Sequence, residues 1–161
     1  MKRSQLYSQI FIYILTILLV SFILIYGYNA VQTFRDRAEQ VSCLKFKNDL
    51  RNAISGILSD FGTVKNEDFE LCGTYTQVCF VESFKRIDKN NLPFNVDPII
   101  KDNILSGAGR NVFLVEKIAK DSFYAGNISV DQDVMCVNAL NSKVSLRLEG
   151  KGNHVFLTRQ N

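Results

Sequence analysis

The apolar run from Ile10 to Tyr28 constrains this chain more than any other feature. No charged side chain occurs between Arg3 and Arg35. The hydrocarbon core of a bilayer is about 30 Å thick, and an α-helix crosses it in roughly 20 residues while satisfying its own backbone hydrogen bonds. Tyrosines lie toward both ends of the run, where amphipathic rings favour the headgroup layer. The sequence therefore predicts a basic segment over residues 1–9 and a single-pass transmembrane helix over residues 10–28.

The remaining length leaves room for one small domain outside the lipid, because the chain has only 161 residues. It carries 19 Lys and Arg against 16 Asp and Glu, and Lys2 and Arg3 account for two of the basic residues. The rest of the chain is thus nearly neutral. Nucleic-acid-binding domains carry a strongly basic face, so we expect no nucleic-acid partner.

An amphipathic helix is predicted to follow the membrane segment over residues 29–62. Apolar residues recur there at steps of mostly three and four, while charged residues occupy other positions. Gly62 is expected to end this helix, and an alternative is two helices hinged near Tyr28 or Gly56. The apolar positions are Val31, Phe34, Ala38, Val41, Leu44, Leu50, Ile54, Ile57, Leu58 and Phe61.

Residues 63–161 are predicted to form a β-rich head. Residues 69–84 are rich in β-branched and aromatic types and read as two strands with a bend near Gly73. The Asp97-Pro98 pair predicts a helix start, with Gly107 and Gly109 closing that helix. Further strands are expected at 112–115, buried on both faces, at 128–130 and 134–137, and in a terminal hairpin of 144–148 and 155–157. Residues 85–96 read as a loop.

The fold class is therefore α+β, with a long N-terminal helix and a small antiparallel β-sheet packed on its apolar stripe. The chain contains no internal repeat or low-complexity tract.

Four cysteines, Cys43, Cys72, Cys79 and Cys136, form an even set in a small domain, which favours disulfides. Three connectivities are possible. Cys72 and Cys79 flank the predicted bend and could meet across adjoining strands, which leaves Cys43 to pair with Cys136. A tetrathiolate zinc site is the alternative, but the six residues between Cys72 and Cys79 exceed the tight spacing usual for zinc. We expect no metal and no cofactor.

Residues that carry catalytic chemistry are scarce. His154 is the only histidine and is expected at the surface near a hairpin exit. Asp131 and Asp133 could hold a hard cation, although a polar turn is the simpler interpretation. Gly150 and Gly152 lack the spacing of a phosphate-binding loop and read as turn residues. The sequence predicts no catalytic residue and no enzyme.

Two arguments about the orientation of the chain disagree: one places the head in the cytoplasm and the other places it outside. The apolar run is longer than a secretory signal core, and Tyr28-Asn29-Ala30 offers no small-x-small cleavage site, so an uncleaved anchor is expected. Lys2 and Arg3 precede the run and four basic residues follow it, Arg35, Arg37, Lys45 and Lys47, so charge alone places the head in the cytoplasm. The cysteines and the glycosylation sequon beginning at Asn127 favour an oxidising exterior instead. Because long domains translocate despite flanking charge, we expect an extracytoplasmic head.

The start of the chain, Lys2-Arg3-Ser4-Gln5 followed at once by the apolar helix, resembles the class III signal peptide of archaeal type IV pilin-like proteins. The resemblance covers about the first thirty residues; Ser4 stands where that family usually has Gly, and Gln9 where its fifth mature residue is commonly Glu. It implies cleavage between Ser4 and Gln5 by a prepilin peptidase and packing of the apolar helices into a filament core. It implies no enzymatic activity.

Two functions are compatible with these features. The first is a pilin-like subunit or minor component of a cell-surface assembly, with membrane lipid and other pilin-like subunits as partners. The second is a membrane-anchored binding module whose sheet holds a ligand or protein. An exposed apolar strip on the helix is expected to mediate self-association; it comprises Val31, Phe34, Ala38 and Val41.

Overall fold

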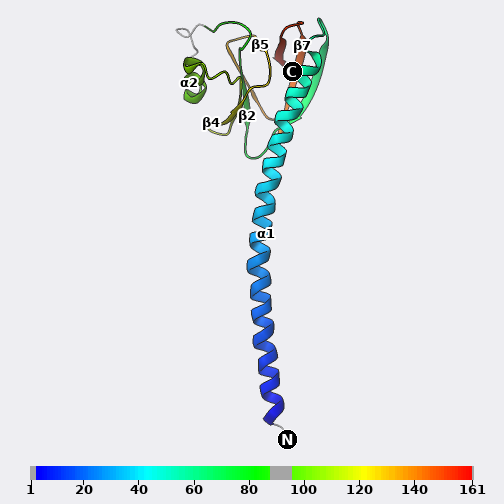
Figure 1. Cartoon of the computed structure of the whole chain (residues 1–161), viewed down its shortest axis with the longest axis vertical. Coiled ribbons are helices and arrows are strands. Elements are labelled where there is room, and N and C mark those ends of the chain that lie inside the picture. Colours follow the sequence, from blue (N-terminus) through cyan, green and yellow to red (C-terminus); the bar gives the residue numbers. More distant parts are fainter. Residues whose placement is uncertain (1–2, 88–95, 161) are drawn as a thin grey trace. The chain divides into compact units, whose positions relative to one another are not determined.

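The computed structural model describes the backbone of residues 3–87 and 96–160, and side chains from residue 10 onward. The chain folds as two compact units, Met1–Gln40 and Val41–Asn161. Helix α1, Arg3–Ile57, belongs to both (Figure 1). It has no hinge at Tyr28 or Gly56, and it ends at Ile57, earlier than expected. The residues up to Gly62, which has a positive φ of 82°, form turns instead of a last helical turn.

The first unit is helical throughout its described part and contains one stretch that is long and apolar enough to cross a membrane. The two aliphatic hydroxyls within residues 10–28, those of Thr16 and Ser21, are compatible with an apolar surrounding. Thr16 Oγ1 donates to the carbonyl of Ile12 at 3.0 Å, and Ser21 Oγ donates to that of Ile17 at 2.8 Å. These bonds satisfy the side chains within the helix, as lipid requires.

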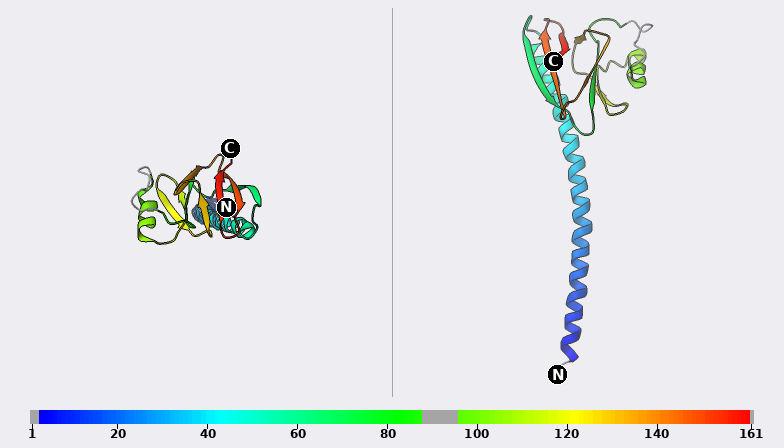
Figure 2. Two further views of the ribbon diagram at one scale, coloured as in Figure 1. Left: turned by 90° about the horizontal axis from the view of Figure 1, so that it is seen from above. Right: turned by 180° about the vertical axis from the view of Figure 1, so that it is seen from behind.

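The second unit, called the head, contains the end of α1, a short helix α2 and two four-stranded sheets over the described residues. The first sheet has the order β1-β7-β8-β5, and the second has the order β4-β3-β2-β6. In Figure 2, β1 and α2 lie at opposite sides of the head. The elements are β1 (Val64–Glu70), β2 (Gln77–Val81), α2 (Pro98–Ser106), β3 (Val112–Val115), β4 (Ala119–Phe123), β5 (Ile128–Val130), β6 (Val134–Asn138), β7 (Lys143–Gly150) and β8 (Val155–Arg159).

The prediction of one antiparallel sheet was wrong in two respects. There are two sheets, and β5 pairs with β8 in parallel. The bend near Gly73 does not join two paired strands, because β1 pairs with β7 whereas β2 pairs with β3 and β6. The predicted terminal hairpin is confirmed, since β7 and β8 pair antiparallel.

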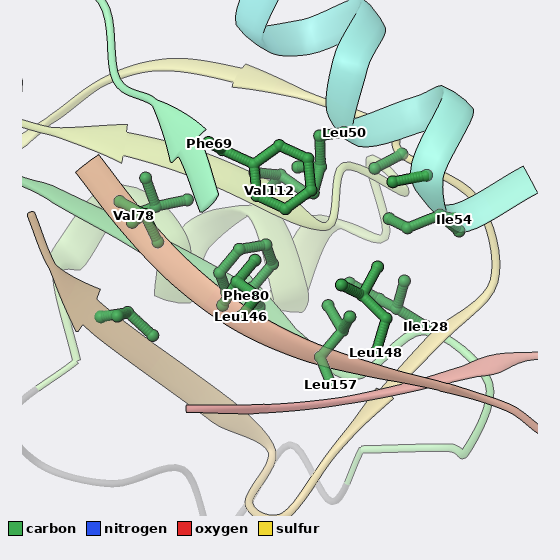
Figure 3. Close-up of a cluster of buried hydrophobic side chains, with 14 of the residues drawn as sticks. Leu50, Ile54, Phe69, Val78, Phe80, Val112, Ile128, Leu146, Leu148 and Leu157 are labelled. Carbon is green, nitrogen blue, oxygen red and sulfur yellow. The ribbon is translucent and has the colours of Figure 1, made fainter. Parts of the chain in front are cut away.

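One face of α1 packs into the head. Phe46, Leu50 and Ile54 are at most 3% exposed and lie in one cluster with side chains of both sheets. Figure 3 shows Leu50 and Ile54 directed at the cluster that includes Phe69 of β1 and Leu148 of β7. The expected apolar stripe included two residues that do not face the core, because Leu44 is 58% exposed and Phe61 is 82% exposed.

Strand β3 of the second sheet is buried on both faces. In β3, Val112 and Leu114 contact the cluster below α1, while Phe113 and Val115 contact a second cluster that includes Ile100 of α2. This arrangement explains the continuous apolar run predicted for β3.

Helix α2 begins and ends as its sequence predicts. Asp97 caps it by accepting a hydrogen bond from the Ile99 amide, Pro98 occupies the first turn, and Gly107 ends it in the left-handed conformation. The other carboxylate oxygen of Asp97 accepts from the Ala119 amide at 2.9 Å, so the same side chain ties α2 to β4.

Candidate functional site

Helix α1 presents two different faces within the head. Cys43 and Phe46 pack toward the core, whereas Val41 is 65% exposed and Leu44 is 58% exposed. At 3.6 residues per turn, Val41 lies on the opposite side of the helix from Leu50. The folded head therefore leaves this side of α1 uncovered at Val41.

The expected self-association strip follows from the same periodicity. Val31, Phe34, Ala38 and Val41 are spaced by three, four and three residues, which places them along one helix face. All four are exposed. Val41, the member of the strip that belongs to the head unit, lies on a face distinct from the core-facing one, although the sequence suggested one continuous stripe.

The four cysteines all form disulfides, but the expected pairing was wrong. Cys43 bonds to Cys72, joining α1 to the segment after β1, and Cys79 bonds to Cys136. The error follows from the sheet assignment. Because β1 and β2 lie in different sheets, Cys72 and Cys79 do not face each other, whereas Cys79 and Cys136 are direct partners in the β2–β6 register.

The predicted processing residues Ser4 and Gln5 lie in the first turns of α1, where only the backbone is described. The sequon residue Asn127 lies just before β5 and is exposed. Its Oδ1 accepts a hydrogen bond from the Tyr124 hydroxyl at 2.7 Å, while Ser129 of the sequon is buried within β5.

His154 is half-buried and stacks on Phe84, with ring centroids 4.0 Å apart. Partial burial lowers the pKa of His154 below 6.5; the Glu82 charge opposes this shift, and Lys85 and Lys151 add to it.

Asp131 and Asp133 lie in a bend between β5 and β6. Over the described residues, no three His, Cys, Asp or Glu side chains gather in a group that could hold a metal ion.

A cleft of about 500 Å³ lies between the C-terminal end of α2 and the chain that leaves β2. This cationic cleft is the head's best candidate for a ligand site, since ligand sites combine an apolar floor with a few polar groups. Val81, Ile87 and Ile104 supply apolar lining, and Lys85, Arg86, Arg110, Asn103 and Tyr124 are among the polar lining residues.

Among the described residues that line the cleft, one is acidic, Glu82, and its carboxylate accepts hydrogen bonds from backbone amides. It is 6% exposed; Oε1 accepts from the amides of Phe84 and Lys85, and Oε2 accepts from the Val130 amide at 3.0 Å. These bonds connect the end of β2 to β5 and so join the two sheets. These bonds give Glu82 a structural role. It keeps its negative charge, but Lys85, Arg86 and Arg110 outnumber it among the described lining residues.

A second buried polar residue, Asn111, continues this connection. Its Nδ2 donates to Ser83 Oγ and to the Gly126 carbonyl, and its Oδ1 accepts from the Ala125 amide. The sequence offered no motif for this region, because the cleft is built from three segments far apart in the chain.

No family model matches this chain, and no curated protein or solved structure matches it.

Proposed function

We propose that this chain is a non-catalytic, membrane-anchored protein with an extracytoplasmic head, and that it serves as a pilin-like subunit or minor component of a cell-surface assembly. In this role the apolar part of α1 anchors the chain in lipid and then packs with the same helix of other subunits. The head is displayed outside the membrane.

The observation that carries the proposal is that one face of α1 packs into the head core while another apolar face stays exposed. Its last turns are built into the head core through Phe46, Leu50 and Ile54, yet Val41 and Leu44, within the head unit, stay exposed. An apolar helix face that its own domain leaves open is a surface suited to another helix. The class III-like start of the chain supports a neighbouring copy or a related subunit as that partner.

The disulfides support the extracytoplasmic location of the head. Both bonds join residues distant in sequence, with separations of 29 and 57, and such structural disulfides persist in oxidising compartments. We give them more weight than Arg35 and Arg37, because charge near a membrane segment does not prevent long domains from translocating.

Crosslinking tests the assembly. Phe34→Ser with Val41→Ser should leave the head folded, because neither side chain contributes to its core, and should reduce crosslinked oligomers in native membranes. The matched control is Asp36→Ser with Gln40→Ser, which makes two exposed substitutions on another side of the same helix segment. Equal crosslinking of the Phe34/Val41 variant and the parent, with thermal melting unchanged, would show that the strip is not the interface.

The mature N-terminus distinguishes the pilin-like reading from a plain anchor. Intact-mass analysis or N-terminal sequencing of protein from membranes should find Gln5 as the first residue. A chain that retains Met1 would contradict processing by a prepilin peptidase and would favour the second function.

That second function is a membrane-anchored binding module. The observation that favours it is the cationic cleft, which the assembly role does not require. Both functions use the same anchor and the same exterior head.

A further inference from the structure

Among its described lining residues, the cationic cleft has an excess of positive charge, with Lys85, Arg86 and Arg110 against Glu82. Among the described residues, neither Lys85 nor Arg86 forms an ion pair with a carboxylate. Arg110 donates one N–H to the Ser122 carbonyl, which orients the guanidinium and leaves further N–H donors. Because three cationic side chains outnumber the one carboxylate among the described lining residues, the cleft favours an anionic group.

The C-terminal end of α2 indicates which kind of anion the cleft favours. The cleft includes Asn103 and Gly107, so it lies at a helix C-terminus, where the backbone carbonyls carry partial negative charge. This position disfavours a multiply charged phosphate, which is typically bound at helix N-termini. It suits a singly charged carboxylate on a ligand whose hydroxyl groups can donate hydrogen bonds to carbonyl oxygens.

One aromatic ring also lines the cleft. Tyr124 is 48% exposed, and its hydroxyl bond to Asn127 and the bond from Arg51 Nε to its carbonyl hold it in place. A rigid aromatic face provides a flat apolar surface, which matches the C–H face of a pyranose ring. The volume of about 500 Å³ falls in the range of small-molecule sites.

We propose that the cationic cleft binds an acidic sugar of the hexuronate class. The carboxylate lies against Arg86 and Arg110, with Lys85 adding charge, and the sugar ring packs on Tyr124. This site goes beyond the assembly role, because it uses no residue of the α1 strip.

Titration of the full chain in detergent micelles tests the proposal. D-glucuronate, D-glucose and inorganic phosphate are compared at constant ionic strength by ligand-observed NMR. We expect the parent to bind glucuronate more tightly than either other probe. Arg86→Gln should weaken glucuronate binding about tenfold, because a hydrogen bond to a charged group is lost, and Tyr124→Leu should weaken it while phosphate binding changes little.

The matched control removes charge outside the cleft through Lys101→Gln with Arg147→Gln, both exposed in the head. It should bind glucuronate like the parent, and thermal melting of every variant confirms folding. Glucuronate that does not bind, or a control variant that loses as much affinity as Arg86→Gln, overturns the site. Phosphate binding as tight as glucuronate binding, with no effect of Tyr124→Leu, overturns the sugar assignment. Neither result depends on crosslinking, so the assembly proposal stands or fails separately.

Discussion

At the residue scale, the turn before β7 contains the two non-glycine residues with positive φ over the described chain. Asn141 has φ 52° and Ser142 has φ 59°, and Leu140 and Lys143 exchange both backbone hydrogen bonds across them. This geometry corresponds to a two-residue type I′ turn, which favours Asn-Gly. The serine is thus less well suited to its backbone conformation than glycine.

Ser142→Gly should therefore raise the free energy of unfolding by about 0.5–1 kcal/mol, because glycine adopts positive φ without a steric cost. Urea unfolding followed by circular dichroism measures the change. Ser142→Ala is the control, since it removes the hydroxyl but keeps the Cβ, and it should bring no gain. A gain in the alanine variant equal to that in the glycine variant would contradict the backbone explanation.

His154 gives the head a pH-dependent contribution to stability. Its pKa is lowered in the folded state by partial burial against Phe84, so the unfolded chain takes up the proton first as the pH falls. The contribution is complete above the unfolded pKa near 6.5 and is lost as the pH falls toward the folded value.

The melting temperature of the parent should therefore decrease more between about pH 7.5 and pH 5 than that of His154→Phe, which keeps the ring stack but does not titrate. The difference should be small, about 2 °C or less, because His154 is near solvent. Differential scanning calorimetry at both pH values measures it. Identical pH profiles of parent and variant would assign the whole acid effect to other groups.

At the scale of the element, the two faces of α1 should respond differently to truncation. Phe46 is 3% exposed and makes edge-to-face contacts with Phe69 and Phe123, at centroid distances of 6.4 and 6.3 Å. Phe46→Ala should cost about 3–5 kcal/mol of stability, as for other buried aromatic residues. Leu44→Ala should cost no more than about 0.5 kcal/mol, because its side chain is mostly exposed.

Chemical denaturation of the full chain in micelles measures both values. Leu44→Ala is itself the matched control, since it lies two residues away in the same helix. A large loss for Leu44→Ala and a small one for Phe46→Ala would reverse the assignment of the core-facing side.

Local signals in the sequence predicted several elements correctly. The Asp97-Pro98 start and Gly107 end specify α2, and the alternation of Val144, Leu146 and Leu148 specifies β7. Strand β4 was missed because its sequence, Ala-Lys-Asp-Ser-Phe, is polar between two buried ends. Strand β1 begins earlier than predicted for the same reason, since it is an edge strand rich in charged residues.

At the scale of the whole molecule, which strands pair with one another could not be predicted from the local sequence pattern. The strands around Gly73 were identified, but nothing in them shows that β1 joins β7 and that β2 joins β6. Disulfide pairing follows from that choice. The cationic cleft is likewise formed only when the segments around Arg86, Arg110 and Tyr124 come together, so no sequence motif indicated it.

The disulfide pairing is the sharpest test of this sheet arrangement. Trypsin leaves Cys72 and Cys79 in one peptide, residues 66–85, because no Lys or Arg lies between them. With the pairs Cys43–Cys72 and Cys79–Cys136, that peptide should be linked to both other cysteine peptides, residues 38–45 and 121–143. Pairing of Cys72 with Cys79 would instead give an internally bridged peptide and a separate two-peptide species.

A second digestion separates the two remaining connectivities. Chymotrypsin cleaves after Tyr75, between Cys72 and Cys79, and should divide the three-peptide species into one product that joins Cys43 to Cys72 and another that joins Cys79 to Cys136. Mass spectrometry of alkylated, non-reduced protein identifies both products. A Cys43–Cys79 product would contradict the β2–β6 pairing, because Cys79 lies directly opposite Cys136 in that register. Four alkylated thiols would contradict both the disulfides of the head and the oxidising exterior proposed for it.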